Sequence, residues 1–260
     1  MAEYVLVGGA WLGGWCWRPV ARRLRGDGHD AHPATLTGLG ERAHLASPEV
    51  DLETHVTDVV NLIEYEDLRD VVLVGYSYGG LVVTGAADRV PERVSRLVYL
   101  DTTPLPDGGA LIDKFPPELR RRAERQVKEQ GGGWKFPMPP REELADMASL
   151  EGLDDDRLGL LRSRATPQPF GTYTQPLRLT NPAREALPKL GIACSFSPDR
   201  MRQMIASERP PVGDPSGLDW RFVGLPTGHY PMLSRPDDLA EVLLSLAPPA
   251  ADGGTNPREK

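Results

Sequence analysis

The feature that most constrains this chain is a serine bracketed by glycines directly after an apolar run. The run is Val71-Val72-Leu73-Val74, and the segment that follows is Gly75-Tyr76-Ser77-Tyr78-Gly79-Gly80. A continuous apolar run of this kind is typical of a strand buried on both faces of a parallel sheet. The G-x-S-x-G after it predicts a tight turn into a helix, which strains Ser77 and projects its hydroxyl above the sheet. Ser77 is therefore the candidate nucleophile.

Strand and helix signals alternate on both sides of this turn. We expect strands at residues 4–7, 31–36, 71–74, 96–100, 192–197 and 220–223. We expect helices at residues 18–24, 52–63, 80–90 and 237–246. Such alternation is the signature of a parallel sheet with helices on both faces. The fold class is thus α/β, with a mostly parallel sheet of about six strands.

The alternation stops between residues 107 and 188. This stretch holds an arginine-rich helical pattern, a run of three glycines and a proline-rich segment. A chain of 260 residues suits one large domain with an insertion. We expect a core of residues 1–106 and 189–247, a mostly helical cap of residues 107–188, and a disordered tail of residues 248–260.

Charge and composition exclude several classes of partner. The chain has 30 Lys and Arg against 37 Asp and Glu, a net charge of −7, which lacks the basic surface that nucleic acid or an anionic membrane requires. Its apolar runs fall far short of the roughly 20 residues that cross a bilayer. Cys16 and Cys194 are too few for a disulfide framework. We expect a cytoplasmic protein that acts on a small apolar molecule, and the sequence is compatible with a homodimer.

A serine hydroxyl needs an adjacent base, and five histidines are available. His229 follows the last predicted strand, in a loop at the carboxyl edge of the sheet that can reach Ser77. His55 falls on the polar face of the helix at residues 52–63, where we expect it to be solvated. No histidine or cysteine has the spacing of a metal site. We therefore expect neither a metal nor a cofactor.

The acid that would orient His229 has two candidates. Asp101 ends the strand after the nucleophile's helix, and Asp199 follows the strand before the histidine. Either carboxylate could fix the imidazole and stabilise its charged form. As non-catalytic roles, Asp101 could cap its strand end and Asp199 could cap a helix at residues 200–206. We favour Asp101, because strand geometry alone brings it to the active-site edge.

Several phrases of the sequence resemble a known family. They are Leu6-Val7-Gly8-Gly9-Ala10-Trp11, Gly13-Gly14-Trp15-Cys16-Trp17, Thr35-Leu36-Thr37-Gly38-Leu39-Gly40-Glu41-Arg42, the turn at 75–80, Leu97-Val98-Tyr99-Leu100-Asp101, Thr166-Pro167-Gln168-Pro169 and Gly228-His229. In this order, over residues 4–246, the chain resembles the α/β-hydrolases. Within them it is similar to the plant methylesterases, the hydroxynitrile lyases and their bacterial esterase relatives. This resemblance implies an α/β-hydrolase fold with a helical cap.

The resemblance also implies an oxyanion hole made of the backbone N–H groups of Ala10 and Tyr78. The chain departs from the family at Gly8 and Tyr76, where histidines are usual, so side-chain bonds that brace the loop after the first strand are lost. The plant pattern places the acid near Ser197, with Asp199 two residues late. Hydroxynitrile lyases have lysine where this chain has Tyr230, which disfavours cyanohydrin cleavage.

The leading hypothesis is a cofactor-free serine hydrolase that cleaves an ester, thioester or lactone of a small apolar molecule. The alternative is a lyase, isomerase or cyclase of secondary metabolism on the same scaffold. A third hypothesis, a non-catalytic ligand-binding relative, conflicts with the presence of both Ser77 and His229. Aromatic and apolar side chains, mostly of the cap, are candidates for the substrate pocket. They are Trp11, Leu36, Trp134, Phe136, Met138, Phe170, Tyr173 and Tyr230.

Overall fold

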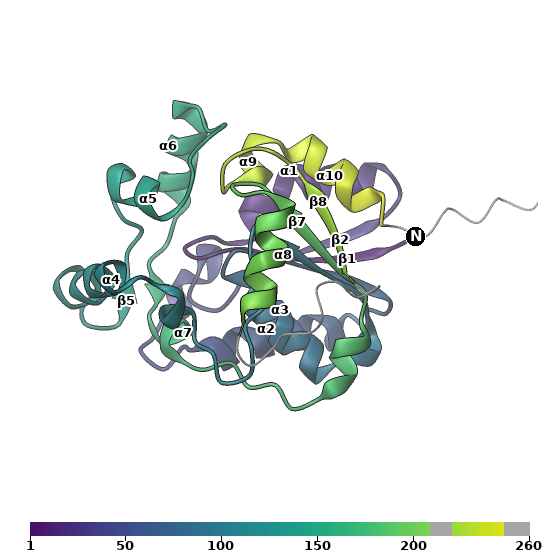
Figure 1. The fold of residues 1–260 in the computed structure, drawn as a ribbon, viewed down its shortest axis with the longest axis horizontal. Helices are drawn as coiled ribbons and strands as arrows, with labels where there is room; N and C mark the ends of the chain where they lie inside the picture. Colours follow the sequence, from purple (N-terminus) through teal and green to yellow (C-terminus); the bar gives the residue numbers. More distant parts are fainter. Residues whose placement is uncertain (209–219, 247–260) are drawn as a thin grey trace, which may run out of the picture.

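The computed structural model describes residues 1–208 and 220–246 and arranges them around a parallel sheet (Figure 1). In the described residues this sheet has six strands in the order β2-β1-β3-β4-β7-β8, and every neighbouring pair is parallel. The strands are β1 (Glu3–Val7), β2 (Asp30–Ala34), β3 (Val71–Tyr76), β4 (Val94–Leu100), β7 (Lys189–Ala193) and β8 (Trp220–Gly224). The predicted fold class is confirmed.

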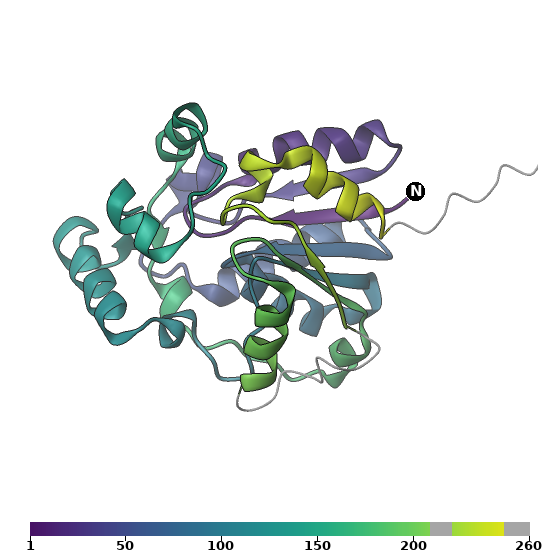
Figure 2. The same cartoon turned by 45° about the horizontal axis from the view of Figure 1, so that its top comes forward.

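Helices cover both faces of the sheet. Helices α1 and α10 pack on each other over one face, and α2, α3 and α8 cover the other (Figures 1 and 2). Their bounds are α1 (Arg18–Gly26), α2 (Leu52–Tyr65), α3 (Gly79–Arg89), α8 (Pro198–Ser207) and α10 (Pro236–Leu244). Shorter helices are η1 (Gly14–Trp17), η2 (Gly40–Leu45), η3 (Pro91–Arg93), η4 (Leu111–Lys114), η5 (Pro182–Ala186) and α9 (Pro231–Ser234).

Helix α2 shows why these residues form a helix at this place. The side chain of Asp51 accepts a hydrogen bond from the Thr54 N–H, and the Thr54 hydroxyl faces back to the Asp51 amide, which makes a capping box. The apolar stripe expected from the sequence is buried, with Val56, Val59 and Ile63 against the core. The buried stripe thereby holds the helix against the core, where it packs beside α3.

The elements from η4 to α7, between β4 and β7, lie beside the carboxyl ends of the strands, whereas η5 leads into the start of β7 (Figure 1). All of them fall within residues 107–188, which we call the insertion. Besides η4 and η5 they are α4 (Pro117–Gln130), β5 (Lys135–Phe136), α5 (Arg141–Met147), α6 (Asp155–Arg164), β6 (Gln168–Pro169) and α7 (Gly171–Thr174). Strands β5 and β6 pair with each other as an antiparallel ribbon.

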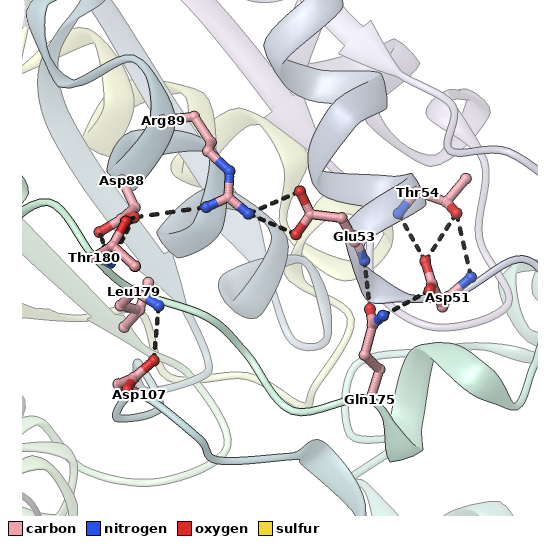
Figure 3. A network of polar contacts seen from close by, with 9 residues as sticks. All are labelled: Asp51, Glu53, Thr54, Asp88, Arg89, Asp107, Gln175, Leu179 and Thr180. Atoms are coloured by element: carbon pink, nitrogen blue, oxygen red, sulfur yellow. Dashed lines mark hydrogen bonds and ion pairs between the residues drawn. The ribbon is translucent and has the colours of Figure 1, made fainter.

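The end of the insertion is bound along α2 and α3 by polar contacts (Figure 3). Gln175 donates to the Asp51 carboxylate at 2.6 Å and accepts the Glu53 N–H at 2.6 Å. Asp88, which is buried in α3, accepts the Thr180 N–H at 2.9 Å. Because helix α7 immediately precedes these contacts, the core helices determine where α7 lies.

The structure differs from the sequence at the end of one strand. The strand expected at residues 192–197 ends at Ala193, because the next two amides, those of Cys194 and Ser195, turn away from the ladder to bond the Asp101 carboxylate. The predicted tail at residues 248–260, and residue 247 of the predicted core, lie outside the described residues. None of the helices that the structure describes is long and apolar enough to span a membrane.

Candidate active site

Ser77 sits at the sharp turn between β3 and α3. Its φ is +50°, in the left-handed region that few non-glycine residues adopt. A Cβ at Gly75 would come within 2.6 Å of the Gly79 carbonyl oxygen, and a Cβ at Gly79 within 2.6 Å of the Gly8 carbonyl oxygen. Glycine is therefore required on both sides of the serine for the turn to form.

The structure brings Ser77, His229 and Asp101 together. His229 follows β8, and its Nε2 lies 2.9 Å from Ser77 Oγ while its Nδ1 lies 2.7 Å from Asp101 Oδ2. Tyr76 pairs with Leu100 across β3 and β4, so Ser77 and Asp101 leave adjacent strands at the same level. Because a carboxylate only accepts, Nδ1 carries the imidazole proton and the Nε2 lone pair faces the serine hydroxyl.

Asp101 is buried and surrounded by donors. Its Oδ2 accepts the Ser195 hydroxyl at 2.6 Å, and its Oδ1 accepts the N–H groups of Cys194 and Ser195 at 2.9 and 3.0 Å. Burial raises the pKa of this carboxyl, but the contacts with His229, Ser195 and Cys194 together lower the pKa below its usual value. The group is therefore a carboxylate at neutral pH.

Asp199 lies elsewhere, on the first turn of α8. Its exposed carboxylate pairs with Arg202 at 2.7 Å. The helix is capped instead by Ser197, whose hydroxyl accepts the Arg200 N–H at 3.1 Å. The predicted capping role of Asp199 is thus wrong, because the helix begins two residues earlier than expected, with Pro198 in its first turn.

The two predicted oxyanion donors both line the cavity above Ser77. Within the described part of the chain, no group accepts a hydrogen bond from the amide of Ala10 or Tyr78. The loop that carries Ala10 is held by the insertion: the Trp11 N–H donates to Gln168 Oε1 at 3.0 Å, and the Trp11 indole donates to the Phe136 carbonyl at 2.9 Å. These bonds hold the loop in place in a chain that has Gly8 where the family usually has histidine.

The cavity at Ser77 has a volume of about 210 Å³. Three of the predicted pocket residues, Trp11, Tyr173 and Tyr230, line it. The sequence did not indicate Tyr76, one threonine or the remaining apolar wall as lining. The threonine and the apolar residues are Leu111, Phe115, Leu144, Met147, Ala148 and Thr102. Since five of these six lie in or directly after short helices of the insertion, which of their faces points inward depends on tertiary packing.

The other five predicted pocket residues do not line this cavity. Leu36 and Phe136 are fully buried in the core, and Phe136 packs its ring on Trp11 at 5.4 Å. Phe170 stacks on Tyr173, with ring centroids 6.1 Å apart, and meets Phe136 edge to face. Trp134 lies under the Lys135 ammonium, and Met138 packs half-buried against the core. In the structure Leu36 packs in the core and the other four pack within the insertion, so none of the five lines the cavity at Ser77.

His55 is also not where the sequence placed it. The imidazole is fully buried, not solvated, with Nδ1 2.8 Å from the Tyr78 hydroxyl and Nε2 2.8 Å from the Thr37 carbonyl oxygen. The polar face of α2 turns toward the loop after β2, so a position that looks solvated in a helical pattern is covered. This histidine therefore touches a residue of the candidate oxyanion hole.

The insertion also holds the loop that carries His229. The Gly228 N–H donates to the Glu151 carbonyl at 3.0 Å, and the His229 N–H donates to the Ser149 carbonyl at 2.7 Å. A Cβ at Gly228 would come within 2.5 Å of the Glu151 oxygen, so glycine allows this close approach. We call the pairing of residues 149–151 with Gly228 and His229 the clasp.

Comparison with known proteins agrees with this architecture. A model of the alpha/beta hydrolase family matches residues 4–242, nearly the whole described chain. The chain belongs to the α/β-hydrolase family. A relative from Nocardioides sp. (strain SG-4G), named carbendazim hydrolyzing esterase, is 36% identical to this α/β-hydrolase over 95% of the chain and 100% of its own length.

Further relatives are also esterases or alpha/beta-hydrolases. Putative methylesterase 14, chloroplastic, from Arabidopsis thaliana is 27% identical over 94% of this chain and 72% of its own. Among solved structures, an extracellular alpha/beta-hydrolase from a Paenibacillus species, described as homologous to Tobacco Salicylic Acid Binding Protein 2, superimposes with a TM-score of 0.76 at 22% identity, covering 94% of this chain and 98% of its own. This α/β-hydrolase is an enzyme whose relatives are esterases, as the sequence predicted.

Proposed function

We propose that this α/β-hydrolase is a cofactor-free serine esterase, with Ser77 as nucleophile, His229 as base and Asp101 as acid. The observation that carries the proposal is the chain of two short contacts, 2.7 Å from Asp101 to His229 and 2.9 Å from His229 to Ser77. It ends at a hydroxyl that lines a cavity. An ionised carboxylate, a neutral imidazole and a serine in this order are what acyl transfer requires.

In the proposed reaction, Ser77 Oγ attacks the substrate carbonyl carbon while His229 Nε2 takes the hydroxyl proton. The amides of Ala10 and Tyr78 donate to the oxygen that becomes negative. Asp101 stabilises the imidazolium, which then gives its proton to the departing alkoxide as the carbon–oxygen bond breaks. Water, deprotonated by the same imidazole, hydrolyses the acyl-serine and restores the enzyme.

The cavity indicates which substrates to test. Its lining is apolar and aromatic apart from a few hydroxyl groups, and its volume suits a small molecule. We propose an ester, thioester or lactone of a small, largely apolar molecule as substrate. Relatives named as methylesterases and as a carbendazim hydrolyzing esterase make methyl esters and carbendazim two compounds for the first assays.

The test combines labelling with turnover. Ser77 is expected to react with a fluorophosphonate, and Ser77→Ala is expected to lower kcat/KM on short p-nitrophenyl esters by at least about 10³-fold. Ser163→Ala, a change of an exposed serine in α6, serves as the matched control. Full activity of Ser77→Ala would overturn the nucleophile assignment. Labelling without turnover of any ester would favour the lyase or cyclase alternative.

The proposed reaction uses only side chains and backbone amides. In residues 1–208 and 220–246, no three His, Cys, Asp or Glu side chains gather as a metal site would need. Ester turnover is therefore expected to be unchanged in EDTA. A loss of activity in EDTA that a divalent cation restores would contradict the proposed mechanism.

A further inference from the structure

The buried His55 has no role in the reaction as described, yet both of its ring nitrogens are engaged. Nε2 lies 2.8 Å from the carbonyl oxygen of Thr37, which can only accept a hydrogen bond. Nε2 must therefore carry the proton, and in the neutral ring Nδ1 then has the lone pair. The Tyr78 hydroxyl, 2.8 Å from Nδ1, is thus the donor to His55.

The Tyr78 hydroxyl suits the role of donor to His55, and the Thr37 carbonyl suits the role of acceptor. Burial raises the pKa of the Tyr78 hydroxyl well above its usual value, so the hydroxyl keeps the proton that it donates. The Thr37 carbonyl is held in place because the N–H and hydroxyl of the same residue donate to Asp58, at 2.6 and 2.9 Å. Asp58 is on α2 with His55, so the loop after β2 and α2 are tied together around the imidazole.

A small displacement of Tyr78 would move a proposed donor of the oxyanion hole. It is the residue after Ser77, it caps α3 without a side-chain hydrogen bond to that helix, and its amide is a proposed oxyanion donor. Its ring stacks on Tyr173 of α7, with centroids 6.0 Å apart and planes within 3° of parallel. The hydroxyl at the far end of this ring bonds to His55 and also lies within reach of the Thr172 side chain.

We propose that His55 is a positioning residue of the oxyanion hole: by anchoring the Tyr78 side chain, it keeps the Tyr78 amide aimed at the carbonyl oxygen that Ser77 attacks. The inference rests on the proposed ester hydrolysis. The elements around His55 support it, because the capping box at Asp51 and the bonds of Gln175 fix the start of α2 against the segment that follows α7 (Figure 3). The imidazole is therefore a fixed point against which Tyr78 is set.

The first experiment compares His55→Leu and Tyr78→Phe. Tyr78→Phe keeps the backbone amide and the ring but removes the donor to His55. Each variant is expected to lower kcat on a p-nitrophenyl ester about tenfold with KM within about twofold, because an oxyanion donor acts mainly in the transition state and a misaligned one loses part of its effect. The double variant is expected to be no slower than the single ones, since both break the same bond.

The matched control is Ile63→Ala, a change of a fully buried residue two turns further along α2. It is expected to lower the melting temperature while kcat stays within about twofold of the unchanged enzyme. His55→Gln, which can restore one of the two hydrogen bonds, is expected to recover part of kcat. If His55→Leu loses thermal stability but keeps kcat, as the control does, the histidine is only structural and the proposal is overturned.

Two measurements do not depend on knowing the natural ester. The rate constant for labelling of Ser77 by a fluorophosphonate, whose phosphoryl oxygen enters the same hole, is expected to fall about tenfold in His55→Leu. In protein enriched with nitrogen-15, NMR of the His55 imidazole is expected to show the Nε2–H tautomer. An Nδ1–H tautomer, or unchanged labelling rates in both variants, would overturn the positioning role. Absence of any labelling in the unaltered enzyme would instead contradict the proposed function.

Discussion

At the scale of single residues, backbone strain is concentrated around the reacting serine. Five non-glycine residues in the described part of the chain have positive φ, and three of them are Trp11, Ser77 and Asp101, at +65°, +50° and +48°. Such conformations cost of order 1–3 kcal/mol each and persist only where the surroundings enforce them. Here the surroundings are the strand ends and the insertion, so the strain indicates where geometry matters to function.

The choice between two aspartates is a prediction at this scale. Asp101→Asn is expected to lower kcat by about 10³- to 10⁴-fold, because an amide at this position no longer fixes the Nδ1–H tautomer or stabilises imidazolium. Asp199→Asn loses one exposed contact with Arg202, so its kcat should be unchanged and its free energy of unfolding altered by less than about 1 kcal/mol. Steady-state kinetics with thermal melts on both variants make the comparison.

The reverse pattern, a folded but slow Asp199→Asn beside a nearly normal Asp101→Asn, would reject the assignment. Two nearly normal variants would mean that a Ser77–His229 pair works without a carboxylate. Strand geometry favoured Asp101 in the sequence, and the structure has that geometry: adjacent parallel strands end at the same level, and the residues just after them meet.

At the scale of elements, the clasp connects the insertion to the histidine. Two backbone hydrogen bonds and the close approach at Gly228 place residues 149–151 directly on the loop of His229. The next residue, Gly152, has a φ of +79°, and a Cβ there would come within 2.9 Å of the Thr227 hydroxyl. The position of the imidazole therefore depends on how the insertion is packed.

Gly152→Ala tests this dependence, with Gly133→Ala as its matched control. Gly133 has a similar φ of +85°, but a Cβ there meets nothing within 4 Å. Both variants pay about 1 kcal/mol for the left-handed backbone. Only Gly152→Ala also pushes the clasp away, so it alone is expected to lower kcat, several-fold, in ester assays. Equal kcat values for the two variants would show that the clasp does not position His229.

Elements that follow from local sequence patterns could be predicted, and those set by tertiary contacts could not. The strands, the serine turn and the strand-end aspartate follow from local patterns, because a buried parallel sheet imposes a strong apolar run and its strand ends share one edge. The cavity wall does not follow, since Leu111, Leu144 and Met147 lie on short helices whose inward face is set by contacts distant in sequence. His55 was missed for the same reason: a helical pattern shows its polar face without showing what covers it.

At the scale of the whole molecule, the buried ionisable groups predict how stability responds to acid. His55 lies among groups from three elements: Asp51 and Asp58 at α2, Arg42 of η2, and the Tyr78 hydroxyl. Burial lowers the pKa of its imidazole from 6.5 to about 4, an effect that the hydrogen bond to the Thr37 carbonyl and the two nearby carboxylates only partly offset. Between these two pH values the His55 imidazole is therefore neutral in the folded protein and protonated in the unfolded chain.

The pKa difference of His55 between the folded and unfolded states sets how the free energy of unfolding changes with pH. Between pH 6.5 and 4 the unfolded chain binds more protons at this site than the folded one, so the free energy of unfolding is expected to fall with falling pH, by roughly 3 kcal/mol for this group. His55→Leu cannot titrate there. Urea unfolding of the two proteins from pH 7 to pH 4 should therefore show their stability difference shrinking as the pH falls. Parallel curves would mean that the buried imidazole does not titrate in this way, because any contribution from the remaining ionisable groups is common to both proteins and cancels in the difference.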